Sequence, residues 1–226
     1  MSSRVPSRFA DRREAGRYLA DAVAGLREHD SLLVLGIPRG GVPVAYEVAV
    51  GLGAPLDVIV VRKLGHPDQP ELAIGAIASG GVLVLNPEAA AGLPQRVIEK
   101  VAEREQHELE RRERAYRGGR PAVDPTGTVV VLVDDGLATG SSMRAAIRAL
   151  RQRRPARIIV AVPVAPTSTA AEIGPTVDRF VCLIESDYFS AVGEWFEDFS
   201  ATSDREVQEL LARAAQRNLD GDAIAG

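Results

Sequence analysis

Two adjacent carboxylates, Asp134 and Asp135, follow an apolar run in the segment VVVLVDDGLATGSS (129–142). Two acids at the tip of a strand can accept hydrogen bonds from the vicinal hydroxyls of a ribose, or lie close to a magnesium ion. The small residues behind them lead into a helix, and the free amides at a helix start can bind a phosphate. The segment therefore predicts a holder for a sugar phosphate.

The acids and Gly136 could also form an ordinary Asp-Gly hairpin turn. However, Thr139-Gly140-Ser141-Ser142 leads into MRAAIRALRQRR, whose apolar residues recur at helical spacing instead of returning as a strand. The chain lacks the nucleotide P-loop pattern G-x-x-x-x-G-K-[ST], and GIPRGG (36–41) is not the dinucleotide pattern G-x-G-x-x-G. A strand, acids, hydroxyl-rich turn and helix favour a phosphate cradle of another kind.

Apolar runs that could form strands alternate with helical patterns along the chain. Continuous runs of Val, Ile and Leu predict a parallel sheet covered on both faces. In such a doubly wound α/β core, ligands bind at the carboxyl ends of the strands. We predict strands at 32–36, 56–62, 82–86, 129–134, 157–163 and 179–184, with helices at 11–26, 40–52 and about 141–153.

One segment departs from this alternation. Residues 93–117 predict a helix that is rich in charge and has few apolar anchors. Its charges could pair at i,i+4, as Glu108 with Arg112 and Glu110 with Arg114. We interpret it as a solvated helix, with a dimerisation or lid element as the alternative, so a homodimer is one expectation.

Composition narrows the class of protein. A chain of 226 residues suits one large or two small domains, and 46% hydrophobic with 26% charged residues is typical of a globular protein. We predict a single domain over 1–226. The net charge of −4 argues against bulk attraction to nucleic acid. No apolar run reaches the roughly 20 residues of a membrane span, and no secretory signal is recognisable. The lone Cys182 lies in an apolar run and fits a reducing cytoplasm, so we expect a cytoplasmic protein.

At residues 129–142 the sequence resembles the type I phosphoribosyltransferases. VVVLVDDGLATGSS looks like their phosphoribosyl-pyrophosphate signature, with apolar residues, two acids and a T-G-x-[TS] phosphate loop. The resemblance implies that Asp134 and Asp135 hold the ribose hydroxyls, directly or through a metal-bound network. It also implies a 5′-phosphate site formed by Ala138, Thr139, Gly140, Ser141 and Ser142.

Two further segments resemble parts of the same family. Arg39-Gly40-Gly41 follows the first strand and looks like the pyrophosphate loop, where glycines permit close approach and Arg39 adds positive charge. Lys63 opens a stretch rich in proline and glycine that resembles the flexible catalytic loop, at about 63–81. The resemblance implies that Lys63 reaches the pyrophosphate, with Arg62 or His66 as weaker candidates.

The last part of the chain concentrates the aromatic residues. Its position after the last strand resembles the hood that covers the acceptor base in this family, within a hood and C-terminal helix at about 185–218. Phe189 would stack on the acceptor and Asp187 would be a nearby polar contact. For Trp195 and Phe199 we favour a simpler interpretation, in which the rings pack as a small core.

The resemblance implies a fold with a core at about 30–184, a helical insertion at about 88–118 and the small hood. It implies an enzyme of nucleotide metabolism that needs Mg²⁺ and transfers a phosphoribosyl group from phosphoribosyl pyrophosphate to a small-molecule acceptor. The 6-oxopurine enzymes carry an acid where this chain has Ala138, so hypoxanthine or guanine is a less favoured acceptor. The alternatives are a non-catalytic sensor of phosphoribosyl pyrophosphate or a nucleotide on the same fold, and a sugar-phosphate hydrolase.

Overall fold

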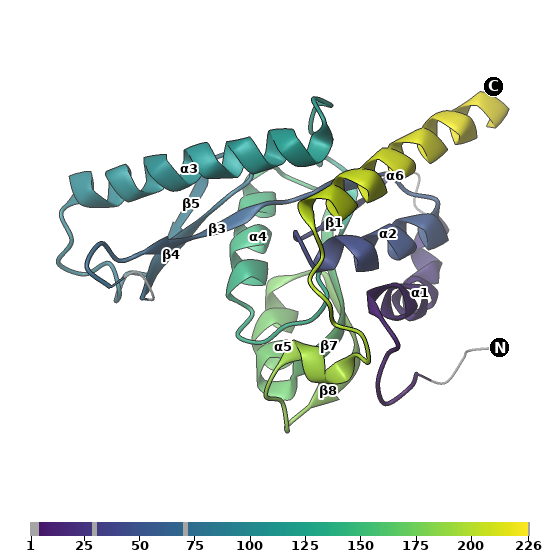
Figure 1. Ribbon diagram of the computed structural model, residues 1–226, viewed down its shortest axis with the longest axis horizontal. Helices are drawn as coiled ribbons and strands as arrows, with labels where there is room; N and C mark the ends of the chain where they lie inside the picture. The colour runs from purple at the N-terminus through teal and green to yellow at the C-terminus, as the bar shows by residue number, and fades with distance from the viewer. Residues whose placement is uncertain (1–4, 29–30, 70–71, 226) are drawn as a thin grey trace.

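The computed structural model describes residues 5–28, 31–69 and 72–225. The elements that position the candidate site belong to a larger central sheet, a smaller sheet and the helices around them (Figure 1). In chain order they are α1 (Arg12–Ala22), η1 (Ala24–Glu28), β1 (Leu32–Gly36), α2 (Gly41–Leu52), β2 (Leu56–Val58), β3 (Val61–Gly65), β4 (Ala73–Ala78), β5 (Val82–Leu85), α3 (Gln95–Arg117), β6 (Val129–Val133), α4 (Ser141–Gln152), β7 (Arg157–Pro166), α5 (Thr167–Ile173), η2 (Gly174–Thr176), β8 (Arg179–Ser186), η3 (Val192–Trp195) and α6 (Asp204–Ala225).

The central sheet has the strand order β2-β1-β6-β7-β8, and every neighbouring pair in it is parallel. Successive residues of β1 enter different cores: Val34 packs with α2 and α6 on one face, and Leu33 packs with α4 and α5 on the other. Burial on both faces explains why these strands consist of continuous apolar runs. The predicted doubly wound α/β fold is confirmed.

A second sheet, β3-β4-β5, is antiparallel and lies beside the central one. One side of it contacts α3 and the other contacts α4 (Figure 1). Two strand predictions are therefore wrong in detail. The expected strand 56–62 divides between the two sheets as β2 and β3, and the expected strand 82–86 forms β5 of the small sheet instead of continuing the parallel series.

The mobile cover expected at 63–81 is largely replaced by this small sheet. Lys63 lies within β3 opposite Ala76 of β4, while Ile74 and Ala78 are fully buried. Residues 70–71, inside the expected loop, lie outside the described residues. The segment looked like a loop because its prolines and glycines break the apolar pattern, but Ile74 and Ile77 pack in one core with α3, and Ala78 packs in the other core with α4.

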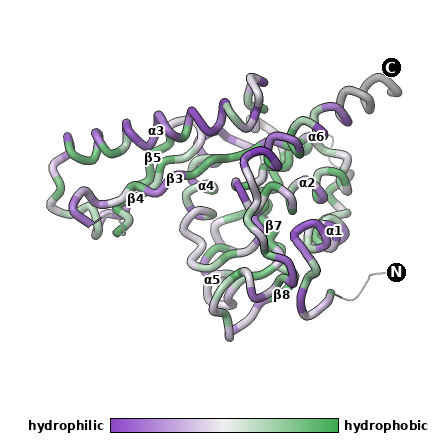
Figure 2. Tube along the Cα trace, in the orientation of Figure 1, coloured by the Kyte–Doolittle hydropathy of each residue, from purple (hydrophilic) through white to green (hydrophobic). Residues whose placement is uncertain are grey.

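The charged helix α3 forms where it was predicted. Arg112 donates to Glu108 at 2.8 Å, and Arg114 lies 3.9 Å from Glu110. The helix is not simply solvated, because Leu109 and Tyr116 are buried in the main core. Figure 2 shows hydrophilic and apolar residues interleaved along it.

The N-terminal segment meets the aromatic tail at the end of β7. Phe9 pairs with Phe196 as an isolated parallel bridge, and both rings are buried in a cluster with Val164. Trp195 and Phe199 pack against this cluster, which confirms the expectation of a small aromatic core. In the part of the chain that the structure describes, no helix has the length and apolar character needed to cross a membrane.

Candidate functional site

The acid pair lies where two parallel strands end side by side. Val133 of β6 is opposite Gly36 of β1, so the loops that follow these strands meet at one edge of the sheet. The amide of Ile37 donates to the carbonyl of Val133 at 2.9 Å, which ties the two loops together. This pairing brings Asp134 and Asp135 to the glycines that open α2.

Gly40 and Gly41 pack directly on the two acids. A Cβ on residue 40 would overlap Oδ2 of Asp135 and lie 2.7 Å from its Cγ. A Cβ on residue 41 would lie 2.9 Å from both Cα and Oδ1 of Asp134. Any larger residue would push the acids away, so the structure brings these four predicted residues together and explains why both glycines are needed.

Burial shapes the electrostatics of the acid pair. Both side chains are half-buried, and Oδ1 of Asp134 accepts a hydrogen bond from the Asp135 amide at 2.9 Å. Loss of water, with the neighbouring carboxylate adding to it, raises the pKa of Asp134 well above its ordinary value. Burial also raises the pKa of Asp135, although the hydrogen bond from Arg12 acts in the opposite direction.

Arg12 is a site residue that sequence reasoning missed. Its Nε donates to Oδ2 of Asp135 at 2.8 Å, and only 11% of its side chain is exposed. The helix start was readable, because Asp11 caps α1 by accepting from the Glu14 amide at 2.7 Å. Nothing local pointed to an acid 123 residues further along the chain.

The predicted phosphate loop leads into α4 through Gly140, whose φ of 68° is the left-handed conformation that suits glycine. Two side chains bind carbonyls of this loop. Thr169 of α5 donates to the carbonyl of Ala138 at 2.8 Å, and Arg144 donates to that of Thr139 at 2.5 Å. The first amides of a helix have no carbonyl partner within it, so they can receive an anion.

Arg39 extends from its loop to the far end of the chain. Its Nη1 lies 3.7 Å from Oδ1 of Asp204, the first residue of α6, and half of its side chain is exposed. The same Asp204 oxygen accepts a hydrogen bond from the Tyr116 hydroxyl at 3.0 Å. Arg39 therefore rests against the α3 and α6 ends instead of the acid pair.

Lys63 is exposed on β3, in the sheet that does not carry the acid pair. Its neighbour Arg62 forms an ion pair with the buried Glu105 of α3, with Nε 3.0 Å from Oε2. Arg62 thus holds α3 on the small sheet. The structure does not bring Lys63 or Arg62 together with the acids.

The predicted acceptor residues lie just beyond β8. Phe189 stacks on Trp195, with ring centroids 6.0 Å apart and an interplanar angle of 22°. Asp187 is exposed, and the intervening Tyr188 has 93% of its area exposed. Tyr188 is therefore the more accessible ring in this stretch, a difference that spacing alone could not reveal.

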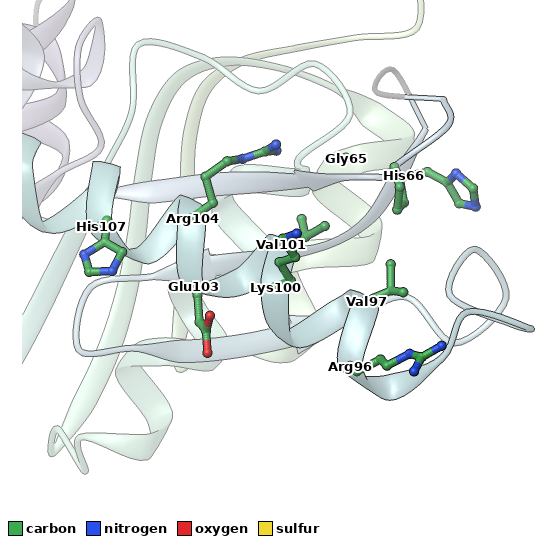
Figure 3. Close-up of a pocket in the computed structure, with 10 residues that line it drawn as sticks. Gly65, His66, Arg96, Val97, Lys100, Val101, Glu103, Arg104 and His107 are labelled. Atoms are coloured by element: carbon green, nitrogen blue, oxygen red, sulfur yellow. The ribbon is translucent and has the colours of Figure 1, made fainter.

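His66 lies in a separate groove, a cavity of about 870 Å³ between the end of β3 and the first turns of α3 (Figure 3). Lys100 and Arg104 also line it. His66 and His107 project from opposite ends of the groove instead of converging. The acid pair and the phosphate loop do not contribute to its lining.

The donors of the acid pair suit a magnesium ion. Mg²⁺ takes oxygen ligands and is commonly held by one or two carboxylates together with substrate phosphates. Over residues 5–28, 31–69 and 72–225, no group of three or more His, Cys, Asp or Glu side chains is arranged to bind a metal. Asp134 and Asp135 supply two carboxylates of the kind that Mg²⁺ binds.

Known proteins resemble nearly the whole chain. A sequence profile for the family described as "Phosphoribosyl transferase domain" matches residues 10–196. "Putative phosphoribosyl transferase Rv0571c" of Mycobacterium tuberculosis is 44% identical over 218 residues, which make up 96% of this chain and 49% of the relative. The chain thus spans about half the length of the curated relatives it matches. The crystal structure of TT1426 from Thermus thermophilus is similar with a TM-score of 0.81 and 45% identity, covering 91% of this chain and 98% of that one.

Proposed function

Because this chain belongs to the phosphoribosyl transferase domain family, we propose that it transfers the 5-phosphoribosyl group of phosphoribosyl pyrophosphate to a nitrogenous acceptor. The observation that carries the proposal is the packing of Gly40 and Gly41 on Asp134 and Asp135. It joins a loop suited to a phosphate group with acids suited to ribose hydroxyls.

The reaction needs placement and charge more than a strong base. As the bond between C1′ and the pyrophosphate oxygen breaks, its electron pair leaves with pyrophosphate and positive charge builds on the ribose. The acceptor nitrogen then forms the new bond with its lone pair. Asp134 and Asp135 would fix the ribose hydroxyls, and the amides from Ala138 to Ser142 would hold the 5′-phosphate.

The pyrophosphate would be bound by the loop that carries Arg39. The ion pair of Arg39 with Asp204 is long at 3.7 Å and half-exposed, so an incoming pyrophosphate can compete for the guanidinium. The Gly40 amide would face the same group, whereas the Gly41 amide donates to the Ile37 carbonyl at 3.1 Å. Lys63 would need a movement of β3 or of the substrate to take part.

Magnesium would complete the charge balance. When bound, Mg²⁺ would neutralise part of the phosphate charge and so favour departure of pyrophosphate. Asp134 and Asp135 would hold it. The Asp135 amide contacts Asp134 and Arg12 contacts Asp135, while the two acid side chains also interact with each other.

The acceptor is constrained by Ala138. This position is exposed at the phosphate loop and cannot remove a proton from the acceptor. A nitrogen that carries a free lone pair is therefore a better nucleophile here than one that must first lose a proton. Simple amines meet this condition before reaction, whereas any purine must lose the proton of its imidazole ring as the new bond forms.

Magnesium-dependent release of pyrophosphate from phosphoribosyl pyrophosphate tests the proposal. The acceptors to compare are adenine, uracil, guanine, hypoxanthine, xanthine, orotate and simple amines. We expect release with at least one of them, and its loss in Asp134→Asn/Asp135→Asn. Unchanged binding of phosphoribosyl pyrophosphate to that double variant would contradict the site assignment.

A non-catalytic sensor is the second candidate function. Two observations favour it, and both concern the cations proposed to bind the leaving pyrophosphate. Arg39 is paired with Asp204, and Lys63 lies in β3 of the other sheet. The sensor would bind phosphoribosyl pyrophosphate tightly in calorimetry. It would release no pyrophosphate with any of the acceptors.

A further inference from the structure

Arg12 connects three parts of the molecule that are distant in sequence. Its Nε donates to Asp135 at 2.8 Å, and its Nη1 donates to the carbonyl of Ser200 at 2.8 Å. Its guanidinium also lies 3.9 Å from the centroid of the Phe199 ring. The side chain thus joins α1, the acid pair and the tail that follows β8.

These contacts fix the orientation of one carboxylate. Asp135 is limited by the backbone of Gly40 on one side and by Arg12 on the other, and both act on the same oxygen, Oδ2. A carboxylate held at one oxygen presents the other in a defined direction. The 15% exposure of its side chain leaves little room for a second rotamer.

From this geometry we propose that Arg12 is a positioning residue, which holds Asp135 in the orientation that recognises a ribose hydroxyl. The inference rests on the proposed function, because it assigns Asp135 to the ribose. Arg12 itself does not contact the sugar. It selects the direction in which the other oxygen of Asp135 points and couples that direction to the tail segment at Phe199 and Ser200.

A simpler role for Arg12 would be to anchor the N-terminal segment on the tail. Arg8 already does this, because its Nε donates to the carbonyl of Phe196 at 3.0 Å without touching the acid pair. The N-terminal segment also pairs with the tail through its backbone, where the Phe9 amide donates to the Trp195 carbonyl at 2.9 Å. Arg8→Gln is therefore a matched control for loss of a tail contact alone.

The test compares two probes that differ by one hydroxyl, ribose 5-phosphate and 2-deoxyribose 5-phosphate. Calorimetry gives the ratio of their dissociation constants for the native chain, Arg12→Gln, Arg12→Lys and Arg8→Gln. We expect the native chain to prefer the ribose form by about tenfold, as a hydrogen bond to a charged group allows. Arg12→Gln should reduce this preference to less than about threefold, Arg12→Lys should restore part of it, and Arg8→Gln should keep it.

Several results would overturn the inference. If Arg12→Gln preferred ribose 5-phosphate as strongly as the native chain does, Arg12 would not orient the acid. If Arg8→Gln lost the ribose preference to the same extent, the effect would come from the packing of the tail on the N-terminal segment. If Arg12→Gln does not fold, Arg12→Lys decides the question, because lysine keeps the charge but cannot reach both Asp135 and Ser200. An unchanged ratio of the two dissociation constants in Arg12→Lys would then refute the positioning role of Arg12. Failure of the native chain to bind either probe or phosphoribosyl pyrophosphate would instead remove the proposed function and this inference with it.

Discussion

Gly40 lies so close to Asp135 that a Cβ on residue 40 would overlap the Oδ2 of that carboxylate. The same oxygen accepts the hydrogen bond from Arg12 at 2.8 Å. The acid is therefore enclosed by backbone on one side and by a guanidinium on the other. Its position depends on the absence of a side chain at residue 40.

Gly40→Ala should displace Asp135 and weaken binding of phosphoribosyl pyrophosphate by at least about tenfold, because the new methyl group cannot coexist with the carboxylate in its present place. Titration calorimetry measures the change. Gly25→Ala is the control, since a Cβ at that position meets no atom within 4 Å. Equal affinities for both variants and the native chain would contradict the described packing.

Asp134→Asn should stabilise the fold while it weakens ligand binding. The raised pKa of Asp134 means that the native state holds its proton to a higher pH than the unfolded chain, whose carboxyl titrates near 3.8. Native stability therefore falls as pH rises from about 4 through the raised pKa, and the cost persists at neutral pH. Asparagine carries no such charge, so the free energy of unfolding of the variant should exceed that of the native chain by on the order of 1 kcal/mol at neutral pH.

Urea unfolding at several pH values tests the sign of this stability difference. The difference between Asp134→Asn and the native chain should shrink as the pH is lowered from 7.5 toward 4, because the native carboxyl then takes up its proton. A variant that is less stable than the native chain at pH 7.5 would mean that the acid stabilises the fold and that our interpretation of its burial is wrong.

Thr169→Val should loosen the phosphate loop. The variant removes the hydrogen bond to the carbonyl of Ala138, which is 2.8 Å long, and keeps the shape of the side chain. We expect a loss of about 1 kcal/mol in stability and a several-fold weaker affinity for ribose 5-phosphate. Thr176→Val removes a similar bond, to the Ile173 carbonyl at 2.7 Å, which lies beyond the end of α5 and does not involve a carbonyl of the loop. It should leave the affinity unchanged, and parallel losses in both variants would argue against a role of Thr169 in the loop.

Local pattern was sufficient for most strands of the central sheet and for the turn that leads from β6 into α4. The run at Val129–Val133 is buried on both faces, so its composition alone indicated a central parallel strand. The family was also correctly recognised from the acids and the loop that follow it. In these segments the structure depends mainly on neighbours in sequence.

The small sheet and the partners of the arginines could not be predicted in this way. The strand Ala73–Ala78 is stabilised by packing between α3 and α4, and its Gly75 fits closely against the Val84 carbonyl of β5. Arg12 and Arg39 bind acids that lie far along the chain, at Asp135 and Asp204. Contacts of this kind depend on how the elements assemble, and the sequence pattern around each arginine carries no sign of them.

Asp57→Ala should destabilise the fold strongly, because the charged α3 depends on a buried ion pair at its end. Nε of Arg117 lies 2.8 Å from Asp57, which also accepts the amide of Val123 at 3.0 Å. Both side chains are at most 10% exposed, so removal of the acid would leave a buried guanidinium whose remaining ion pair is the 3.6 Å contact with Glu113. We expect a loss of about 3–5 kcal/mol in the free energy of unfolding.

Glu108→Ala provides the comparison on the same helix. Glu108 pairs with Arg111 and Arg112 on the exposed surface, where water and salt screen the charges. Its removal should leave the urea midpoint nearly unchanged. If the two variants lost equal stability, surface pairs would anchor α3 as firmly as the buried contact with Asp57. The larger effect of Asp57→Ala would instead locate the anchor at the junction of β2 with the end of α3, next to the Tyr116 hydroxyl that binds Asp204.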